Sequence, residues 1–181
     1  MRLSDEDAKL FYRLWLPLLD YVNEKRGINS NLRDISLSEH LNPIEVKEIA
    51  DVLWEDVSLI DEYLSGRQDI VGDDREIISG WKRCVRGQFI LERILKNGAI
   101  LISLENDSVY QVSGIISSWK EMFGYAHLPL MIQAALIPFR DIIISDGLIQ
   151  TYNVMIGRNL AGTYKDTYMY AKKSGWIHRQ I

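Results

Sequence analysis

The chain of 181 residues is long enough for one folded domain, or for one domain with a helical extension. Its hydrophobic content of 47% and charged content of 25% exclude a wholly disordered chain. The net charge of −4 excludes a generally basic protein that coats nucleic acid, and the single cysteine excludes an intramolecular disulfide.

The charge is unevenly distributed along the chain. Residues 1–80 carry 9 Lys and Arg against 18 Asp and Glu, whereas residues 81–181 carry 12 against 7. The acidic front and the mildly basic back can pair with each other or face different partners, and pairing within the chain is the favoured interpretation.

Three helical segments are predicted in the N-terminal half. Apolar residues recur every four positions over residues 5–25, which predicts a packed helix that Pro17 should kink. Residues 43–65 begin with an Asn-Pro pair, a capping side chain followed by proline at the first helical position. Their apolar spacing fits one helix or two. A third helix is expected from residue 73 to residue 85.

The C-terminal half is predicted to be rich in β-strands. Strand-forming residues between polar turns predict strands over residues 89–95, 99–104, 108–113, 130–137, 142–145 and 148–156. Asn97-Gly98 and Asp146-Gly147 are typical hairpin turns, and Pro138 should separate the fourth strand from the fifth. Because the turns are short, we expect an antiparallel meander. A helix over residues 163–173 follows.

These elements predict an α+β protein in two parts. A helical subdomain of residues 1–86 should pack on a small antiparallel β-barrel or twisted sheet within residues 87–181, which ends in a C-terminal helix. The acidic N-terminus does not read as a signal peptide, and no apolar stretch reaches the ~20 residues that span a bilayer. A cytoplasmic protein is expected, and its many aromatic residues and long first helix are compatible with a homodimer.

No catalytic residue, cofactor site or metal site is predicted. His40, His127 and His178 lie in separate segments without the paired spacing of a zinc site. Cys84 has cationic neighbours that can lower a thiol pKa, but it follows the apolar stripe of the third predicted helix. A buried, unreactive thiol is therefore favoured over a nucleophile.

A candidate anion contact lies between the last strand and the last helix. The segment from Gly157 to Gly162 has the context of an anion-binding helix start, but it lacks the lysine and third glycine of phosphate-binding loops. An ordinary loop is favoured, with Arg158 as a candidate contact for phosphate or carboxylate. An unrecognised hydrolase or transferase site around Cys84 or Arg158 is a third-ranked alternative.

Basic residues near the C-terminus are candidate contacts for nucleic acid. Lys165, Lys172 and Lys173, together with Arg158, alternate with tyrosines in this region. Small barrels bind single strands through basic grooves and aromatic platforms. The tyrosine spacing suits helix packing equally well.

Acidic residues of the front half are a candidate face for a protein partner. Glu55, Asp61 and Glu62 diverge from the apolar stripe of their helical segment. This pattern is more typical of a solvated acidic face than of an acid–base pair.

Several short segments carry a family resemblance. They are residues 43–46, 50–55, 59–63, 81–82, 87–89, 136–139 and 144–148. In order and spacing these segments resemble a set of uncharacterised bacterial proteins found mainly in anaerobic Gram-positive organisms. The resemblance spans roughly residues 43–175 and implies a bacterial cytoplasmic setting and a helical front joined to a β-rich back. It implies no activity.

The sequence therefore indicates a non-enzymatic interaction or accessory module with an unidentified protein partner. The alternative is a single-stranded nucleic-acid binder that uses the β-rich, mildly basic C-terminal half.

Overall fold

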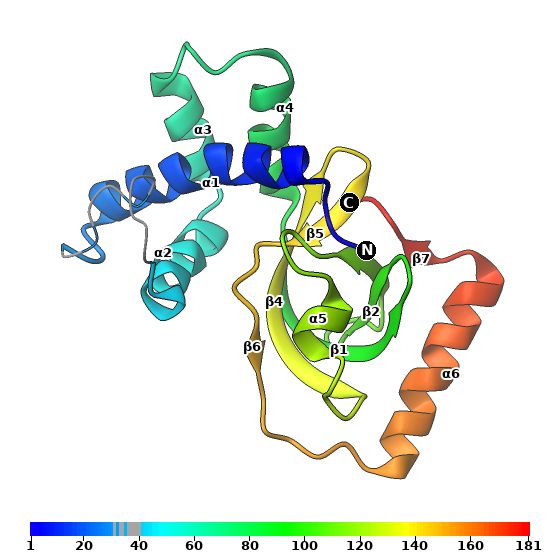
Figure 1. Ribbon diagram of the computed structural model, residues 1–181. Helices are drawn as coiled ribbons and strands as arrows, with labels where there is room; N and C mark the ends of the chain where they lie inside the picture. Colours follow the sequence, from blue (N-terminus) through cyan, green and yellow to red (C-terminus); the bar gives the residue numbers. More distant parts are fainter. Residues whose placement is uncertain (31, 33–34, 36–40) are drawn as a thin grey trace. The chain divides into compact units, whose positions relative to one another are not determined.

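The computed structural model describes residues 1–30, 32, 35 and 41–181, in which six α-helices and seven strands form an α+β protein. The chain divides into two compact units (Figure 1). The N-terminal unit comprises residues 4–83, and the C-terminal unit combines residues 84–181 with residues 1–3. The boundary lies three residues before the predicted one, which was placed between residues 86 and 87.

The N-terminal unit contains four α-helices within its described residues. They are α1 (Asp5–Arg26), α2 (Pro43–Glu55), α3 (Ser58–Gly66) and α4 (Gly72–Gly80), followed by a 3₁₀ turn (Trp81–Arg83). α1 contacts the other three helices. In the core, Trp15 stacks on Trp54 with ring centroids 5.1 Å apart, and Trp81 stands edge-on to Trp15 at 5.5 Å. Aromatic burial therefore supplies much of the core of this unit.

Local capping sets the ends of α1. The Ser4 hydroxyl accepts a hydrogen bond from the backbone N–H of Asp7 at 3.1 Å, and Gly27 ends the helix in the left-handed conformation. α1 continues through Pro17 as one helix. The predicted bounds are confirmed to within one residue.

Residues 43–65 form two helices rather than one. The chain breaks at Asp56, whose carboxylate accepts hydrogen bonds from the N–H and the hydroxyl of Ser58 and so satisfies a donor at the start of α3. The third predicted helix is shorter than expected, because α4 ends at Gly80 and a strand begins at residue 85. Cys84 consequently lies on no helix.

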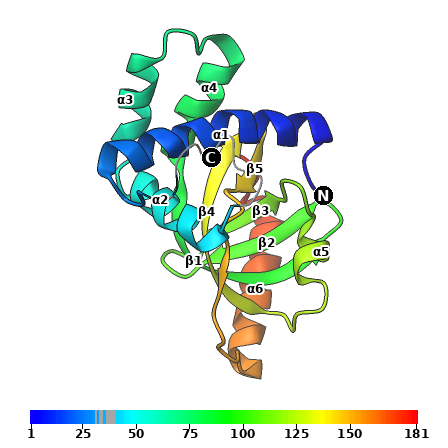
Figure 2. The same cartoon turned by 60° about the vertical axis from the view of Figure 1, so that its left-hand side comes forward.

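The C-terminal unit is built on a ring of paired strands (Figures 1 and 2). Its strands are β1 (Val85–Leu95), β2 (Gly98–Ser103), β3 (Val109–Ser113), β4 (Leu130–Phe139), β5 (Ile142–Ser145), β6 (Gln150–Thr151) and β7 (Ile177–His178); its helices are α5 (Trp119–Phe123) and α6 (Arg158–Ser174). β1 pairs with β2, β2 with β3, β3 with β5, β5 with β4, and β4 again with β1.

The sheet is mixed, which differs from the predicted antiparallel meander. β3 pairs in parallel with β5, and it also pairs in parallel with β7. The connection from β3 to β4 passes through α5, so the β4–β5 hairpin can return β5 alongside β3 in the same direction. β2, β3, β4 and β5 lie within two residues of the predicted ranges, whereas β1 begins four residues earlier than predicted, β6 covers only two of the nine predicted residues, and β7 was not predicted.

The interior of the ring holds one apolar core. Alternate residues of the strands, including Phe89, Leu101 and Leu136, are buried there together with Trp119 of α5. α5 begins at Ser118, which forms a reciprocal capping box with Glu121. Figure 1 shows α5 lying across the ring.

Two turn signals act differently from the sequence-based expectation. Pro138 lies inside β4, because β1 pairs with β4 only as far as Leu136 and leaves an edge where a missing N–H is tolerated. Asp146-Gly147 forms no hairpin. β5 and β6 both pair antiparallel with β4. Asp146-Gly147 therefore connects two consecutive strands that pair with the same neighbour, and it interrupts the pairing as a bulge does.

Candidate functional site

α6 covers the outward-facing surface of β1 and β2. Ile90, Ile100 and Ile102 face outward from β1 and β2 and pack under Tyr168 and Ala171 of α6. Tyr168 is only 3% exposed. Packing on this one face leaves the other faces of α6 open to solvent.

α6 begins five residues earlier than predicted. Its first residue is Arg158, and its N-cap residue Gly157 offers no side-chain cap. The segment expected to be a loop therefore forms the opening turns of the helix. Arg158 is exposed at the start of α6.

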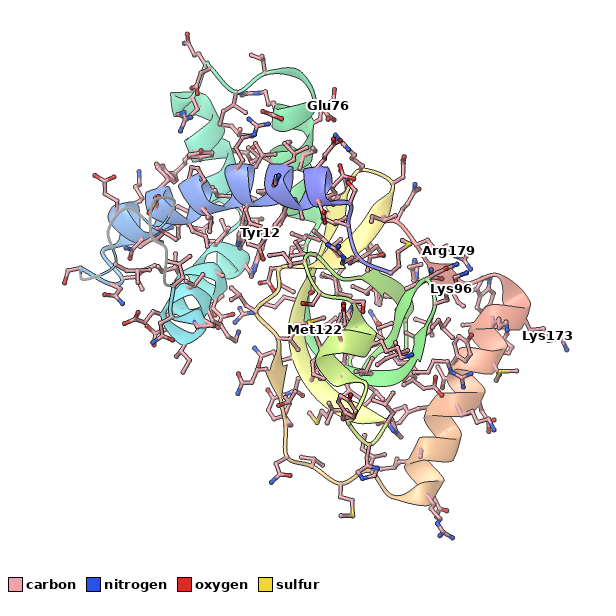
Figure 3. The ribbon with its side chains drawn as sticks, in the orientation of Figure 1. Tyr12, Glu76, Lys96, Met122, Lys173 and Arg179 are labelled. Carbon is pink, nitrogen blue, oxygen red and sulfur yellow. The ribbon has the colours of Figure 1, made fainter. Side chains whose placement is uncertain are left out.

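Three of the four candidate nucleic-acid contacts share one face of α6. Arg158, Lys165 and Lys172 are exposed and are spaced by seven residues. Seven residues advance a helix by two turns and about 10 Å, with a drift of only about 20° around its axis. We call these three residues the cationic stripe. Lys173 lies about 100° around the helix from Lys172, and Figure 3 shows it directed away from the ring.

Positive charge is concentrated on this helix. The C-terminal unit carries 11 Lys and Arg against 7 Asp and Glu. Residues 158–181 alone carry five against one, and that one acid, Asp166, lies about 100° around the helix from Lys165. The electrostatic field beside the cationic stripe therefore attracts anions.

A groove of about 550 Å³ lies between the β2–β3 turn and the C-terminal end of α6. We call it the C-terminal groove; it is lined by residues 106–109, Thr167, Tyr170, Ala171 and residues 175–178. Tyr170 and Trp176 are 60% and 63% exposed, and their rings stand at 80° with centroids 5.5 Å apart. His178 stacks on Tyr110 at 5.1 Å. Among these lining residues, Asp107 carries the acidic side chain.

The cationic stripe and the C-terminal groove are separate surfaces. Tyr170 precedes Lys172 by two residues, which places it about 160° away around the helix axis. The sequence pattern did not identify this groove, because Asp107 and Tyr170 are brought together only by the packing of α6 on the sheet.

The three acidic candidates lie in the N-terminal unit. Glu55 ends α2, and Asp61 and Glu62 lie on α3. Asp61 pairs with Lys82 Nζ at 2.7 Å and Glu62 with Lys25 Nζ at 2.9 Å. The hydrogen bond from Lys25 lowers the pKa of Glu62. Two of the three acids are therefore already neutralised by neighbours in their own unit.

Cys84 is a half-buried thiol at the start of the C-terminal unit. Burial raises its pKa far above the ordinary value, and the nearby carboxylate of Asp146 adds to this effect. The cationic neighbour Arg86 opposes the shift but does not overcome it. This shift disfavours a thiolate nucleophile at Cys84, although the side chain is half-buried rather than fully buried as expected.

The described part of the chain brings no three His, Cys, Asp or Glu side chains together in a group that could hold a metal ion. His127 and His178 lie on different segments of the C-terminal unit, and His40 lies outside the described residues. No helix in residues 1–30 and 41–181 is long and apolar enough to cross a membrane.

No protein-family model, curated protein or solved structure matches this chain. The bacterial resemblance stays a prediction.

Proposed function

We propose that the protein is a non-enzymatic binding module whose C-terminal unit binds single-stranded nucleic acid through the cationic stripe. The observation that supports this proposal is the seven-residue spacing of Arg158, Lys165 and Lys172 on one exposed face of α6. Arginine and lysine side chains bind the phosphate backbone independently of base sequence. Three cationic side chains spaced about 10 Å apart along a helix can contact several phosphates of an extended nucleic-acid strand, rather than one isolated phosphate.

We also propose that the ring of five strands is a small β-barrel of OB type. Its pairing order, with parallel β3 and β5, resembles that of OB barrels, which bind oligonucleotides and oligosaccharides through the face of their second and third strands. In this chain α6 packs on the corresponding outer face. A ligand would therefore contact α6 itself, which agrees with the position of the cationic stripe.

A protein partner at Glu55, Asp61 and Glu62 has weaker support. Asp61 and Glu62 are paired with Lys82 and Lys25, so little uncompensated charge is left to attract a basic partner. The proposed setting is the bacterial cytoplasm, on the strength of the sequence resemblance and the single cysteine.

The test is direct binding of a labelled single-stranded oligonucleotide, followed by fluorescence anisotropy at low salt. The same sequence as a duplex is the comparison. Salt-sensitive binding of the single strand, weakened by Arg158→Glu, Lys165→Glu or Lys172→Glu, is the expected result. No binding of either form at low salt would contradict the proposal.

A further inference from the structure

We propose that the C-terminal groove is a second binding site, independent of nucleic acid, and that it takes a small quaternary ammonium cation. The cation would lie against Tyr170 and Trp176, with the Asp107 carboxylate balancing its charge.

The rings of Tyr170 and Trp176 form a corner beside the groove. The rings of Tyr170 and Trp176 are nearly perpendicular, at 80°, with centroids 5.5 Å apart, and both side chains are more than half exposed. Aromatic rings attract cations to their faces, and groups of such rings recognise alkylated ammonium ions. Exposure of two large rings beside a groove is otherwise unfavourable, since contact with a ligand would remove them from water.

The lining selects the sign of the ligand's charge. Asp107 is the carboxylate of the groove, and the Lys and Arg residues nearest to the lining in sequence, Lys172, Lys173 and Arg179, are not among the lining residues. The lining itself, with one carboxylate and no Lys or Arg, therefore favours a cation over an anion. The cationic stripe lies on the opposite flank of α6, where it serves a different ligand.

The turn that carries Asp107 is well defined. The backbone N–H of Asp107 donates to the Ser103 carbonyl at 3.1 Å, and the Asn106 side chain accepts from the N–H of Ser108 at 3.1 Å. Asp107 has a left-handed φ of 57°, which Asp and Asn both tolerate. Asp107→Asn therefore removes the charge and preserves the turn.

The size of the groove favours a small ligand over a long peptide. Its volume of about 550 Å³ lies within the usual range of about 300–1,000 Å³ for small-molecule sites. An alkylammonium group borne by a peptide is the alternative occupant, and comparison of choline with a trimethyllysine peptide distinguishes the two.

Trp176 is a natural reporter for this site. The chain has five tryptophans, and the other four, Trp15, Trp54, Trp81 and Trp119, are at most 7% exposed. Quenching of tryptophan fluorescence by neutral acrylamide therefore reports mainly on Trp176. The probe is choline chloride, compared at equal ionic strength with sodium chloride and with 3,3-dimethylbutan-1-ol, the neutral analogue of the same shape.

Choline should protect Trp176 from acrylamide in a saturable manner, and should bind about 3- to 30-fold tighter than the neutral analogue. Saturation-transfer NMR on the choline methyl signal extends the test to variants. Trp176→Leu, Tyr170→Leu and Asp107→Asn should each weaken binding several-fold. Tyr125→Leu, at a fully exposed tyrosine elsewhere in the unit, and Asp166→Asn should not.

Equal binding of choline and its neutral analogue, or no saturable protection by choline, would overturn this inference. Protection by a trimethyllysine peptide but not by choline would also overturn it in favour of a peptide ligand. Oligonucleotide binding is measured separately and is expected to be unchanged by Asp107→Asn, so failure here is distinguishable from failure of the proposed function.

Discussion

The guanidinium carbon of Arg93 lies 4.1 Å from the ring centroid of Tyr168, and this pair joins β1 to α6. Arg93 follows a β-bulge, where the register between β1 and β2 shifts across Glu92. Glu92 in turn forms an ion pair with Arg93. The bulge changes the direction of the Arg93 side chain so that its guanidinium lies over the ring of Tyr168. This contact helps to hold α6 on the sheet.

Tyr168 should be the main anchor of α6. Because its ring is buried, Tyr168→Ala should lower the free energy of unfolding by about 3–5 kcal/mol, whereas Tyr168→Phe keeps the ring and should cost less than about 1 kcal/mol. Urea unfolding measures both. Tyr170→Ala, at a mostly exposed tyrosine of the same helix, is the control and should change stability by at most about 0.5 kcal/mol. Equal losses at the two positions would contradict this packing.

Trp119 should stabilise the ring by its bulk rather than by hydrogen bonding. Its indole N–H is buried and has no hydrogen-bond acceptor among the described residues. Trp119→Phe removes that unsatisfied donor while keeping an aromatic ring, so it should cost clearly less than Trp119→Ala, for which we expect about 3–5 kcal/mol. Urea unfolding of both variants checks the order. A loss from Trp119→Phe as large as that from Trp119→Ala would show that the indole N–H matters.

Cys84 should react slowly with thiol reagents in the folded protein. Burial raises the pKa of its thiol, so the folded chain holds the proton to a higher pH than the unfolded chain. Stability from this group is therefore fully present below the ordinary thiol pKa and is lost as the pH rises above it. Cys84→Ala should flatten that part of the pH–stability profile. Rapid modification of folded protein at neutral pH would contradict this account.

The fold was predictable wherever a local pattern determined it. The Asn42-Pro43 start of α2 and the Asn97-Gly98 turn are set by capping and turn chemistry within a few residues. Gly98 has a further role that spacing does not reveal. A Cβ there would lie 2.4 Å from the Val112 carbonyl oxygen, so glycine permits the close approach of β3.

Non-local pairing was not predictable from the same signals. Asp146-Gly147 is as strong a hairpin dipeptide as Asn97-Gly98, but both of its flanking strands lie beside β4. A turn dipeptide determines a bend, whereas the partner of the following strand depends on the whole sheet.

The sequence identified the residues of the cationic stripe but not their alignment on one helix face. Arg158, Lys165 and Lys172 are recognisable as exposed cations, but a helix starting at residue 163 leaves Arg158 outside it and hides the seven-residue spacing. The helix begins at Arg158 after the N-cap residue Gly157, which offers no side-chain cap, and Gly162 within the helix resembles a loop residue. The packing of Tyr168 overrides both weak signals.

The salt dependence of oligonucleotide affinity tests nucleic-acid binding at the cationic stripe most directly. Each phosphate contact with a single strand contributes about 0.7 to the slope of log K against log salt concentration. Replacing Arg158, Lys165 and Lys172 together by Gln should therefore lower the magnitude of the slope by about 2. The matched control replaces the exposed Lys9, Lys96 and Lys120 by Gln and should leave the slope unchanged. Equal slopes for the two triple variants would contradict a nucleic-acid contact at the cationic stripe.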